Sequence, residues 1–360
     1  MVNTTAHRFV SLVQTAGSSA LVTNLETNIK IARVGKFDVP MTINDGLRST
    51  CYLCCPSTAY LDYGAFELKQ VTRNPFLRAC GFGALRMASP VVRAMKIDRQ
   101  VQLNNWLLST NILPPVGPDA WLDAFDSLAK SYPGYVPVLR SVNQAAHSAL
   151  IGAFHREGLT LLPVRKIFTR AYPEERNRTR DDLRDMALRA SGRFIERDGS
   201  SFNDDDFDRA AMLYEKLYIE KYSALNPQYT GRFLAEAQRH CGFELTGLFD
   251  PENRGRMVGI LGQLDQHGTI VSSVVGYDTA LPQRLGLYRW LFSLSDETAR
   301  SRQRFANQSA GAEQFKRNRG AQPAIEYLVV DLRRASRAQR LAGAFLSGLL
   351  QPAASLAIRL

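Results

Sequence analysis

Three consecutive segments decide the fold: FELTGLFDP (243–251), GRMVGILGQLD (255–265) and GTIVSSVVGYD (268–278). In each segment apolar residues alternate with small or polar ones, which is the period-two pattern of a half-buried β-strand. Turn residues separate the segments, at Asp250-Pro251-Glu252-Asn253 and at Gln266-His267-Gly268. Because short turns join antiparallel neighbours, the stretch 243–278 predicts a three-stranded antiparallel meander.

Helical patterns lie on both sides of this meander. Asn203 is followed by three aspartates, which is typical of a capped helix start, and we expect this helix to run to about Lys221. Further helices are predicted over 231–240 and 286–303, and further strands at 193–199, 305–311 and 324–332. The second half therefore has the order strand, two helices, three strands, helix, strand, strand.

The first half alternates strands and helices, the pattern of an α/β layer. Strands are predicted within 28–45 and at 135–142 and 159–169, and helices over 65–97 (broken at Pro75 and Gly81-Phe82-Gly83), 119–130 and 143–158. The stretch 172–192 is dense in charge and poor in apolar residues, which predicts a solvated helix or a linker.

The length and this order predict two halves in one α/β (α+β) chain. The chain has 360 residues, enough for two domains of ordinary size. We expect halves that share one fold over 1–171 and 193–335, joined by the charged linker 172–192 and packed with a cleft between them. The tail 336–360 is predicted to be helical. Docking on the protein is the first interpretation of the tail, with weak contact to a membrane or a partner as the alternative.

Composition narrows the class of protein. Lysines and arginines exceed acidic residues by 11, and 45% of residues are hydrophobic, so a packed core is expected and an acidic disordered chain is excluded. The positive surplus favours a negatively charged partner. Five cysteines include Cys51, Cys54 and Cys55, but no second ligand pair accompanies them, so we expect buried thiols and no metal site. No secretory signal or spanning helix is evident, which favours a cytoplasmic protein.

The order of elements in the second half resembles the Gcn5-related N-acetyltransferase (GNAT) superfamily. VSSVVGYD (271–278) lies where that superfamily has its central splayed strand, and SAGAEQFKRNRG (309–320) resembles the Phe-Lys-…-Gly signature of Fem-type (FemAB-like) acyltransferases. In the first half, 104–114 and 138–151 resemble recurring blocks of a bacterial FemAB-like subfamily. The resemblance covers about 28–332. It implies two GNAT-like halves, each a mixed, mostly antiparallel sheet flanked by helices.

One departure concerns the donor. The usual GNAT pyrophosphate loop, Gln/Arg-x-x-Gly-x-Gly/Ala, has no match after Asp278. A literal match at 78–83 follows no strong strand, which favours a helix break over a phosphate site. Fem-type relatives often lack this loop, and some use aminoacyl-tRNA. The resemblance therefore implies acyl-CoA, acyl carrier protein or aminoacyl-tRNA as co-substrate, with no tightly bound cofactor.

Acyl transfer to an amine needs hydrogen-bond donors at the carbonyl oxygen and a group that moves the amine proton. The resemblance implies Lys316, Asp278 and Tyr277 as catalytic residues, with Lys316 beside the developing oxyanion or a donor phosphate. Substrate or donor contacts are expected, from polar groups at strand ends and from the central strand, at Asn105, Trp106, Arg140, Ser141, Asn143, Val274, Val275, Gly276, Tyr288, Ser309 and Arg319.

Two function classes remain open from sequence. The first is a biosynthetic acyltransferase that moves an acyl or aminoacyl group to an amine of a small molecule or precursor, with acyl carrier protein or tRNA as partner and no DNA. The second is a non-catalytic basic module for RNA or an acidic partner. The most basic run, 300–319, contains only two aromatic residues, Phe305 and Phe315. Because RNA readers interleave aromatic and basic side chains, the sequence favours the enzyme.

Overall fold

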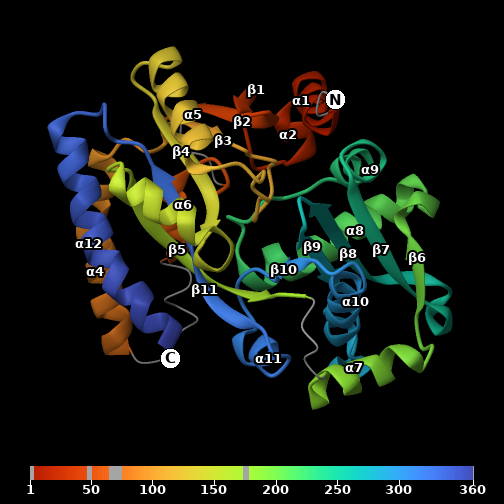
Figure 1. Cartoon of the computed structure of the whole chain (residues 1–360). Helices are drawn as coiled ribbons and strands as arrows, with labels where there is room; N and C mark the ends of the chain where they lie inside the picture. The colour runs from red at the N-terminus through yellow and green to blue at the C-terminus, as the bar shows by residue number, and fades with distance from the viewer. Residues whose placement is uncertain (1–3, 47–50, 65–74, 173–177, 360) are drawn as a thin grey trace.

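The structure is a computed structural model, and it describes residues 4–46, 51–64, 75–172 and 178–359. The first half contains, in chain order, α1 (Thr4–Ala16), α2 (Ser18–Leu21), β1 (Asn28–Val34), β2 (Phe37–Asp45), the π-helix η1 (Thr58–Tyr63), α4 (Pro75–Ala94), β3 (Arg99–Leu103), α5 (Pro118–Ser131), β4 (Val136–Asn143), α6 (Gln144–Arg156) and β5 (Thr160–Arg170). Figure 1 shows α4, α5 and α6 on the left and α1 and α2 at the top, near α9.

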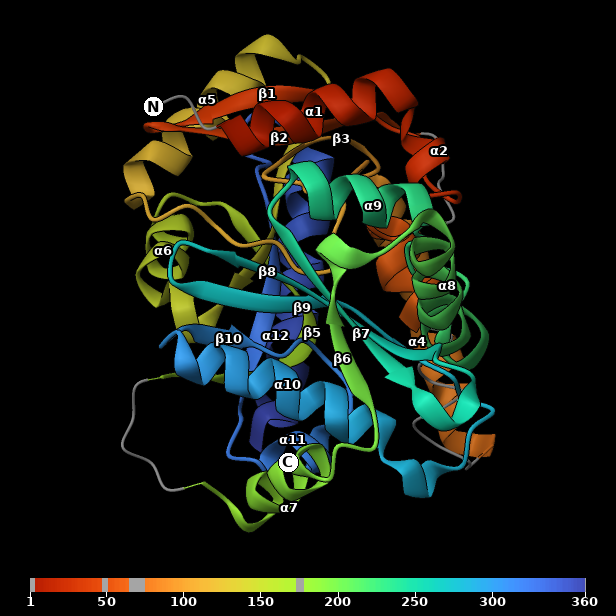
Figure 2. The same cartoon turned by 90° about the vertical axis from the view of Figure 1, so that its right-hand side faces the viewer.

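The second half contains α7 (Arg180–Ala190), β6 (Ile195–Asp198), α8 (Asp204–Glu215), the π-helix η3 (Lys216–Tyr222), α9 (Gly231–His240), β7 (Phe243–Asp250), β8 (Arg256–Gln266), β9 (Thr269–Tyr277), α10 (Leu287–Ser301), β10 (Phe305–Asn307), α11 (Glu313–Arg317), β11 (Gln322–Val330) and α12 (Arg337–Arg359). The meander and the element order predicted for this half are confirmed. The predicted fold class is also confirmed, since a mixed sheet is flanked by helices (Figure 1, Figure 2).

In the described part of the chain, eleven strands form one sheet with the order β1-β2-β3-β4-β11-β5-β10-β9-β8-β7-β6. Apart from the edge strand β6, this order is symmetric about its centre. The strands β1 to β4, counted from one edge, occupy the positions that β7 to β10 occupy counted from the other. Each half contains one parallel pair, β3 with β4 and β9 with β10, among antiparallel neighbours. The order therefore contains one fold twice.

The last strands of the two halves are exchanged. β11 lies between β4 and β5, and β5 lies between β11 and β10. The expectation of two separately packed halves with a cleft between them is therefore wrong. A strand pattern reports which residues are buried and does not specify the neighbouring strand, so the sequence could not reveal the exchange.

Capping residues lie at the N-termini of α8 and α9, where the sequence predicted that these helices begin. Asn203 accepts a hydrogen bond from the amide of Asp206, and the Asp206 carboxylate accepts one from the amide of Asn203, which completes a capping box for α8. Thr230 caps α9 in the same position, through its hydroxyl and the amide of Phe233. α1, α8 and α9 share one apolar core with β7 to β9, which connects the two halves on one face of the sheet.

The match to a phosphate loop at 78–83 lies inside α4 and forms no loop. Of the helix predicted over 65–97, residues 65–74 lie outside the described residues. Residues 51–64 form a loop followed by η1.

The tail forms α12, which packs on β5, β11 and α4. Its Leu346 is buried, and its Ser347 hydroxyl donates to the carbonyl of Leu161 at 2.9 Å. No helix in the described ranges has both the length and the apolar character needed to cross a bilayer.

Candidate functional site

The candidate site lies at the centre of the sheet, where Arg165 of β5 faces Glu326 of β11. The Arg165 Nε donates to Glu326 Oε1 at 2.8 Å, and the Glu326 side chain is 3% exposed. Arg165 also donates to the carbonyl of Ser109 at 2.9 Å and to the hydroxyl of Thr110 at 2.8 Å. Glu326 is the one charged residue of β11, whereas β5 also carries Lys166 and Arg170, so the sequence pattern marks Glu326 but not its partner.

Arg140 approaches the same place from β4. Its guanidinium donates to the carbonyls of Ser109, at 3.2 Å, and Leu53, at 3.3 Å. Two arginines therefore meet at one backbone carbonyl oxygen, that of Ser109. Because Glu326 supplies one negative charge against their two positive charges, the cluster keeps a formal charge of +1.

Some buried polar atoms on β3, on β11 and in the loop before α5 lack partners within the described structure. Both amide atoms of Gln102, in β3, lack a hydrogen-bond partner within the described structure, and the side chain is fully buried. The second carboxylate oxygen of Glu326 and the amide nitrogen of Asn111 are also unpartnered there. A buried polar group without a partner costs about 1–3 kcal/mol, so such groups are expected where a ligand or water completes the bonding.

The register places this cluster between the two parallel pairs. β10 ends at Asn307, which pairs with Thr169 of β5, and Arg165 lies four residues further along β5 in the direction in which β10 has ended. On the other side, Glu326 pairs with Asn143, the last residue of β4, beyond the end of β3. Both parallel pairs therefore separate at the level of the Arg165–Glu326 pair.

Beyond Val271, β9 has no strand neighbour on the β10 side. A β-bulge at Ser273 interrupts its pairing with β8, since Gly262 pairs with Val274 and Gln263 with Ser272. The Ser273 hydroxyl is buried and has no partner among the described residues. A bulge reorients backbone groups, so this part of β9 combines a local irregularity with one side that no described strand pairs.

Tyrosines from both halves of the chain lie beside the cluster of Arg140, Arg165 and Glu326. Tyr52 lies under the guanidinium of Arg140, with 5.5 Å from the ring centroid to Cζ. The Tyr229 hydroxyl donates to the carbonyl of Leu107 at 2.9 Å, and Tyr214 packs against Tyr229. Burial raises the pKa of the Tyr52, Tyr214 and Tyr229 phenols, so all three stay neutral. Tyr218 stacks on Tyr214 and continues the row along η3.

Lys316 lies close enough to Arg165 for the two charges to repel one another, and its role in the reaction stays a prediction. Its side chain is buried, and its ammonium donates to the carbonyls of Gln308 (2.7 Å), Ser309 (3.1 Å) and Ala310 (2.8 Å). All three N–H groups are used, so Lys316 holds the loop 308–310. Burial lowers the pKa of Lys316 to about 7, whereas the three carbonyls favour the charged form.

Tyr277 ends β9, Asp278 follows it, and Tyr288 lies in α10. The Asp278 carboxylate binds Arg209 at 2.8 Å and Lys216 at 3.1 Å, and these partners hold its pKa below the usual range despite partial burial. A carboxylate with a lowered pKa is a weak base. The Tyr277 ring lies 6.3 Å from that of Tyr288, which packs on Phe315, and burial raises the pKa of Tyr288. The catalytic roles of Asp278 and Tyr277 stay predictions.

The predicted main-chain contact at Gly276 has another explanation. A Cβ atom at this position would lie 2.4 Å from the amide nitrogen of Tyr214 and 2.6 Å from the carbonyl oxygen of Leu213. The glycine therefore allows α8 to approach β9. Val274 is fully buried in the core beside α8, and Val275 packs in the core beneath α10.

Most of the site residues predicted in the first half form hydrogen bonds to other groups of the protein. The Asn105 amide donates to Thr42 and Cys54, and its oxygen accepts from the amide of Leu107. The Trp106 indole donates to Asn104. These bonds hold a turn in which Asn104 and Leu107 have positive φ. Of the first-half candidates, Arg140 lies in the cluster.

Ser141 and Asn143 serve the backbone around the site. The Ser141 hydroxyl accepts from the amide of Asn111 at 2.9 Å, and Ser141 has a φ of 67°, a strained conformation for a residue with a side chain. The Asn143 side chain caps α6 by accepting from the amide of Ala146. Both residues therefore fix the end of β4.

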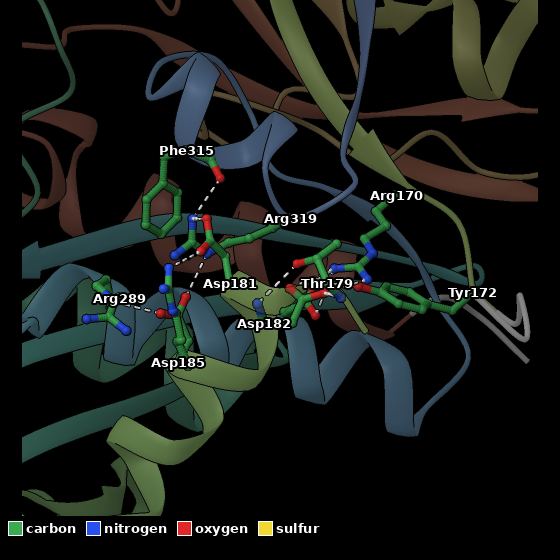
Figure 3. A network of polar contacts seen from close by, with 11 residues as sticks. Arg170, Tyr172, Thr179, Asp181, Asp182, Asp185, Arg289, Phe315 and Arg319 are labelled. Atoms are coloured by element: carbon green, nitrogen blue, oxygen red, sulfur yellow. Dashed lines mark hydrogen bonds and ion pairs between the residues drawn. The ribbon is translucent and has the colours of Figure 1, made fainter. Parts of the chain in front are cut away.

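Figure 3 shows where Arg319 lies: in a buried ion network on α7. Its Nε donates to Asp185 at 2.6 Å, and its guanidinium stacks 3.4 Å above the ring of Phe315. Arg170 joins Asp182 of α7 to Asp296 of α10, at 3.2 and 3.1 Å. The described part of 172–192 contains a helix, one of the two structures expected there, but its Asp182 and Asp185 are buried against arginines from distant segments. Residues 173–177 lie outside the described residues.

Ser309 belongs to the loop that Lys316 holds. Its φ is 58°, its carbonyl accepts from the amide of Phe168, and its amide donates to the side chain of Asn307. Within the described residues no group of His, Cys, Asp and Glu side chains has metal-site geometry. Cys51, Cys54 and Cys55 are buried free thiols.

Comparisons with known proteins concern the fold. No family model matches the chain, and no curated protein matches it. Similar solved structures include L-PGS from Bacillus licheniformis (12% identity, 64% of this chain and 78% of that chain, TM-score 0.44), FemX (9%, 58% and 75%, 0.45) and a tandem GNAT protein from the clavulanic acid biosynthesis pathway (10%, 64% and 74%, 0.38). At these identities and TM-scores the similarities assign no activity. The element order, repeated in both halves, agrees with the order that the resemblance stated from the sequence implies.

Proposed function

We propose that this protein is a GNAT-type, FemAB-like N-acyltransferase that moves an acyl or aminoacyl group to an amine. The observation that supports it most directly is the convergence of both parallel pairs on one level of the sheet, beside the buried Arg165–Glu326 pair. Separated parallel strands leave backbone donors without partners, and a charged pair beside them supplies groups that hold a polar substrate.

The main chain of β9 after Val271 is assigned to the acyl carbonyl. Its amides lack a strand neighbour on the β10 side, and the bulge at Ser273 changes their direction. Fixed N–H donors aimed at a carbonyl oxygen stabilise the negative charge that develops there during acyl transfer. Because they belong to a sheet strand, they need no reorganisation at the moment of reaction.

The cluster of Arg140, Arg165 and Glu326 is assigned to the polar part of a substrate. A carboxylate or phosphate oxygen carries more negative charge than the Ser109 carbonyl, so it would bind the two guanidinium groups more strongly. The free oxygen of Glu326 accepts hydrogen bonds, which suits an amine or ammonium group. The row of tyrosines along η3 leads from this cluster towards Tyr222, which is 37% exposed.

The proposed donor is acyl-CoA, an acyl carrier protein thioester or aminoacyl-tRNA. Each carries phosphate groups, which agrees with the surplus of 11 positive charges. The proposed acceptor is an amine of a small molecule or a biosynthetic precursor.

The test is product detection by mass spectrometry. Purified protein is incubated with an amine-containing metabolite pool and, separately, with acyl-CoA, acyl carrier protein and charged tRNA donors. We expect a new amide product in one donor arm, and its loss in Glu326→Gln and Arg165→Lys, which keep the size of the side chains. Arg33→Lys, at an exposed arginine of β1, is the control. RNA binding with a steep salt dependence and no product in any arm would support the binding module instead.

A further inference from the structure

α4 and α12 lie side by side and form an outer layer at one end of the molecule, on the left in Figure 1. Ten large apolar side chains are exposed in the described part of the chain, and five of them belong to these two helices. They are Met87 (78% exposed), Leu341 (62%), Phe345 (62%), Leu349 (55%) and Leu356 (58%). We call this surface the α4–α12 face.

The row on α12 points outward because the opposite side of the helix is fixed. Leu341, Phe345 and Leu349 are four residues apart, which places them on one stripe. On the inner side, a Cβ atom at Gly343 would lie 2.5 Å from Leu332, so the helix lies directly on the body of the protein there. The apolar row therefore cannot turn inward without breaking this contact.

The charges of the two segments have one sign. Neither 75–97 nor 334–360 contains an aspartate or glutamate. Six of their basic residues are exposed: Arg86, Arg93, Lys96, Arg334, Arg337 and Arg340. Arg337 precedes Leu341 by one helical turn, so the basic end continues directly into the apolar row. An amphipathic helix with basic residues and protruding Leu and Phe side chains is typical of the interface of anionic bilayers.

We propose that the α4–α12 face binds the surface of a bilayer that contains anionic lipids. The apolar side chains protrude as a row of about 22 Å, from the rise of 1.5 Å per residue between Leu341 and Leu356. A bilayer accepts such a row without a complementary shape, whereas a folded protein partner would need a groove that matches it. The absence of acidic residues from both segments selects an anionic surface. This inference is independent of the proposed activity.

The test uses the full-length protein and sedimentation with vesicles of phosphatidylcholine, with or without phosphatidylglycerol. We expect binding only to the anionic vesicles, weakening as salt increases. The double variant Leu341→Glu with Phe345→Glu should bind at least about tenfold less, because it removes two apolar contacts and adds two negative charges. Arg334→Gln with Arg337→Gln should weaken binding to anionic vesicles by about thirtyfold, since each of the two basic residues near the surface contributes about 1 kcal/mol.

The control is Leu183→Glu with Met212→Glu, which makes the same change at apolar residues exposed elsewhere (54% and 50%). This variant should bind as the unmodified protein does, and circular dichroism and thermal unfolding confirm that all variants are folded. Absence of vesicle binding by the unmodified protein, or equal binding by both glutamate double variants, overturns the proposal. Loss of self-association in the Leu341–Phe345 variant with unchanged vesicle binding would instead assign the face to a second copy of the chain.

Discussion

Arg165 and Glu326 are 161 positions apart in the chain, yet they face one another across the β5–β11 pair with 2.8 Å between Nε and Oε1. The exchange of the last strands creates this contact, because β5 comes from the first half and β11 from the second. The pair therefore belongs to neither half alone. Both parallel strand pairs separate at its level, so the site depends on the complete sheet.

Removing one partner of this pair should destabilise the protein strongly. Glu326→Leu leaves the Arg165 guanidinium, 19% exposed, without its carboxylate, and a loss of about 3–5 kcal/mol in the free energy of unfolding is expected. The double variant Arg165→Met with Glu326→Leu removes both charges and should recover most of that loss. Urea unfolding measures both.

Activity should separate from stability in the same variants. Because the pair is assigned to substrate, the double variant should stay inactive even where its stability is recovered. An active double variant would show that the pair only holds the sheet together. A loss below about 1 kcal/mol in Glu326→Leu would show that Arg165 is adequately solvated without its partner.

Much of the fold was predictable from local patterns. The alternation within 243–278 predicts the meander, and Asn203 predicts the start of α8, because burial and capping depend on neighbouring residues. The position of β11 was not predictable, since its apolar sequence suits any central position in the sheet. The ion pairs of α7 were not predictable for the same reason, because its aspartates bind arginines that are distant in the sequence.

The candidate site was predictable only in part. Arg140 was expected from sequence and lies in the cluster. Lys316 was expected to face the substrate, but its charge is held by three carbonyls, which no sequence pattern reports. The polar pair Asn105 and Trp106 serves a turn with positive φ, because amides satisfy such turns as readily as they bind ligands. Glu326 gave a signal as the one charge in an apolar strand, but only the fold reveals that Arg165 is its partner.

Lys316→Ala should lower stability by about 2–4 kcal/mol, because three carbonyls of 308–310 lose their buried donor together. Arg317→Ala is the matched control, since its partner Glu313 is partly exposed and such pairs contribute about 0–1 kcal/mol. Chemical unfolding compares the two. Equal stability of both variants, with activity lost only in Lys316→Ala, would restore the catalytic interpretation of this lysine.

Gly276→Ala should prevent α8 from lying on β9. The new Cβ would be 2.4 Å from the amide nitrogen of Tyr214, and backbone atoms on both sides must move, so a loss of at least about 3 kcal/mol is expected. Gly117→Ala, where no atom lies within 4 Å of the new Cβ, should change stability by less than about 1 kcal/mol. Thermal unfolding distinguishes them, and similar melting temperatures would mean that α8 can shift freely.

His147 should make stability depend on pH between about 6.5 and 4. It lies in the first turn of α6, where its Nδ1 accepts from the amide of Asn143 at 3.2 Å and must be unprotonated. Burial lowers its pKa from 6.5 to about 4. Above pH 6.5 the side chain is neutral in both the folded and unfolded states, and its contribution to stability is complete. Between pH 6.5 and 4 the unfolded state binds the proton more readily, so the free energy of unfolding should fall by about 2–3 kcal/mol as the pH decreases.

Urea unfolding from pH 7.5 to 4.5 measures how the free energy of unfolding depends on pH. His147→Gln keeps an acceptor but cannot titrate, so it should remove the part of this dependence that His147 causes. An identical slope in the variant would show that other groups cause the loss.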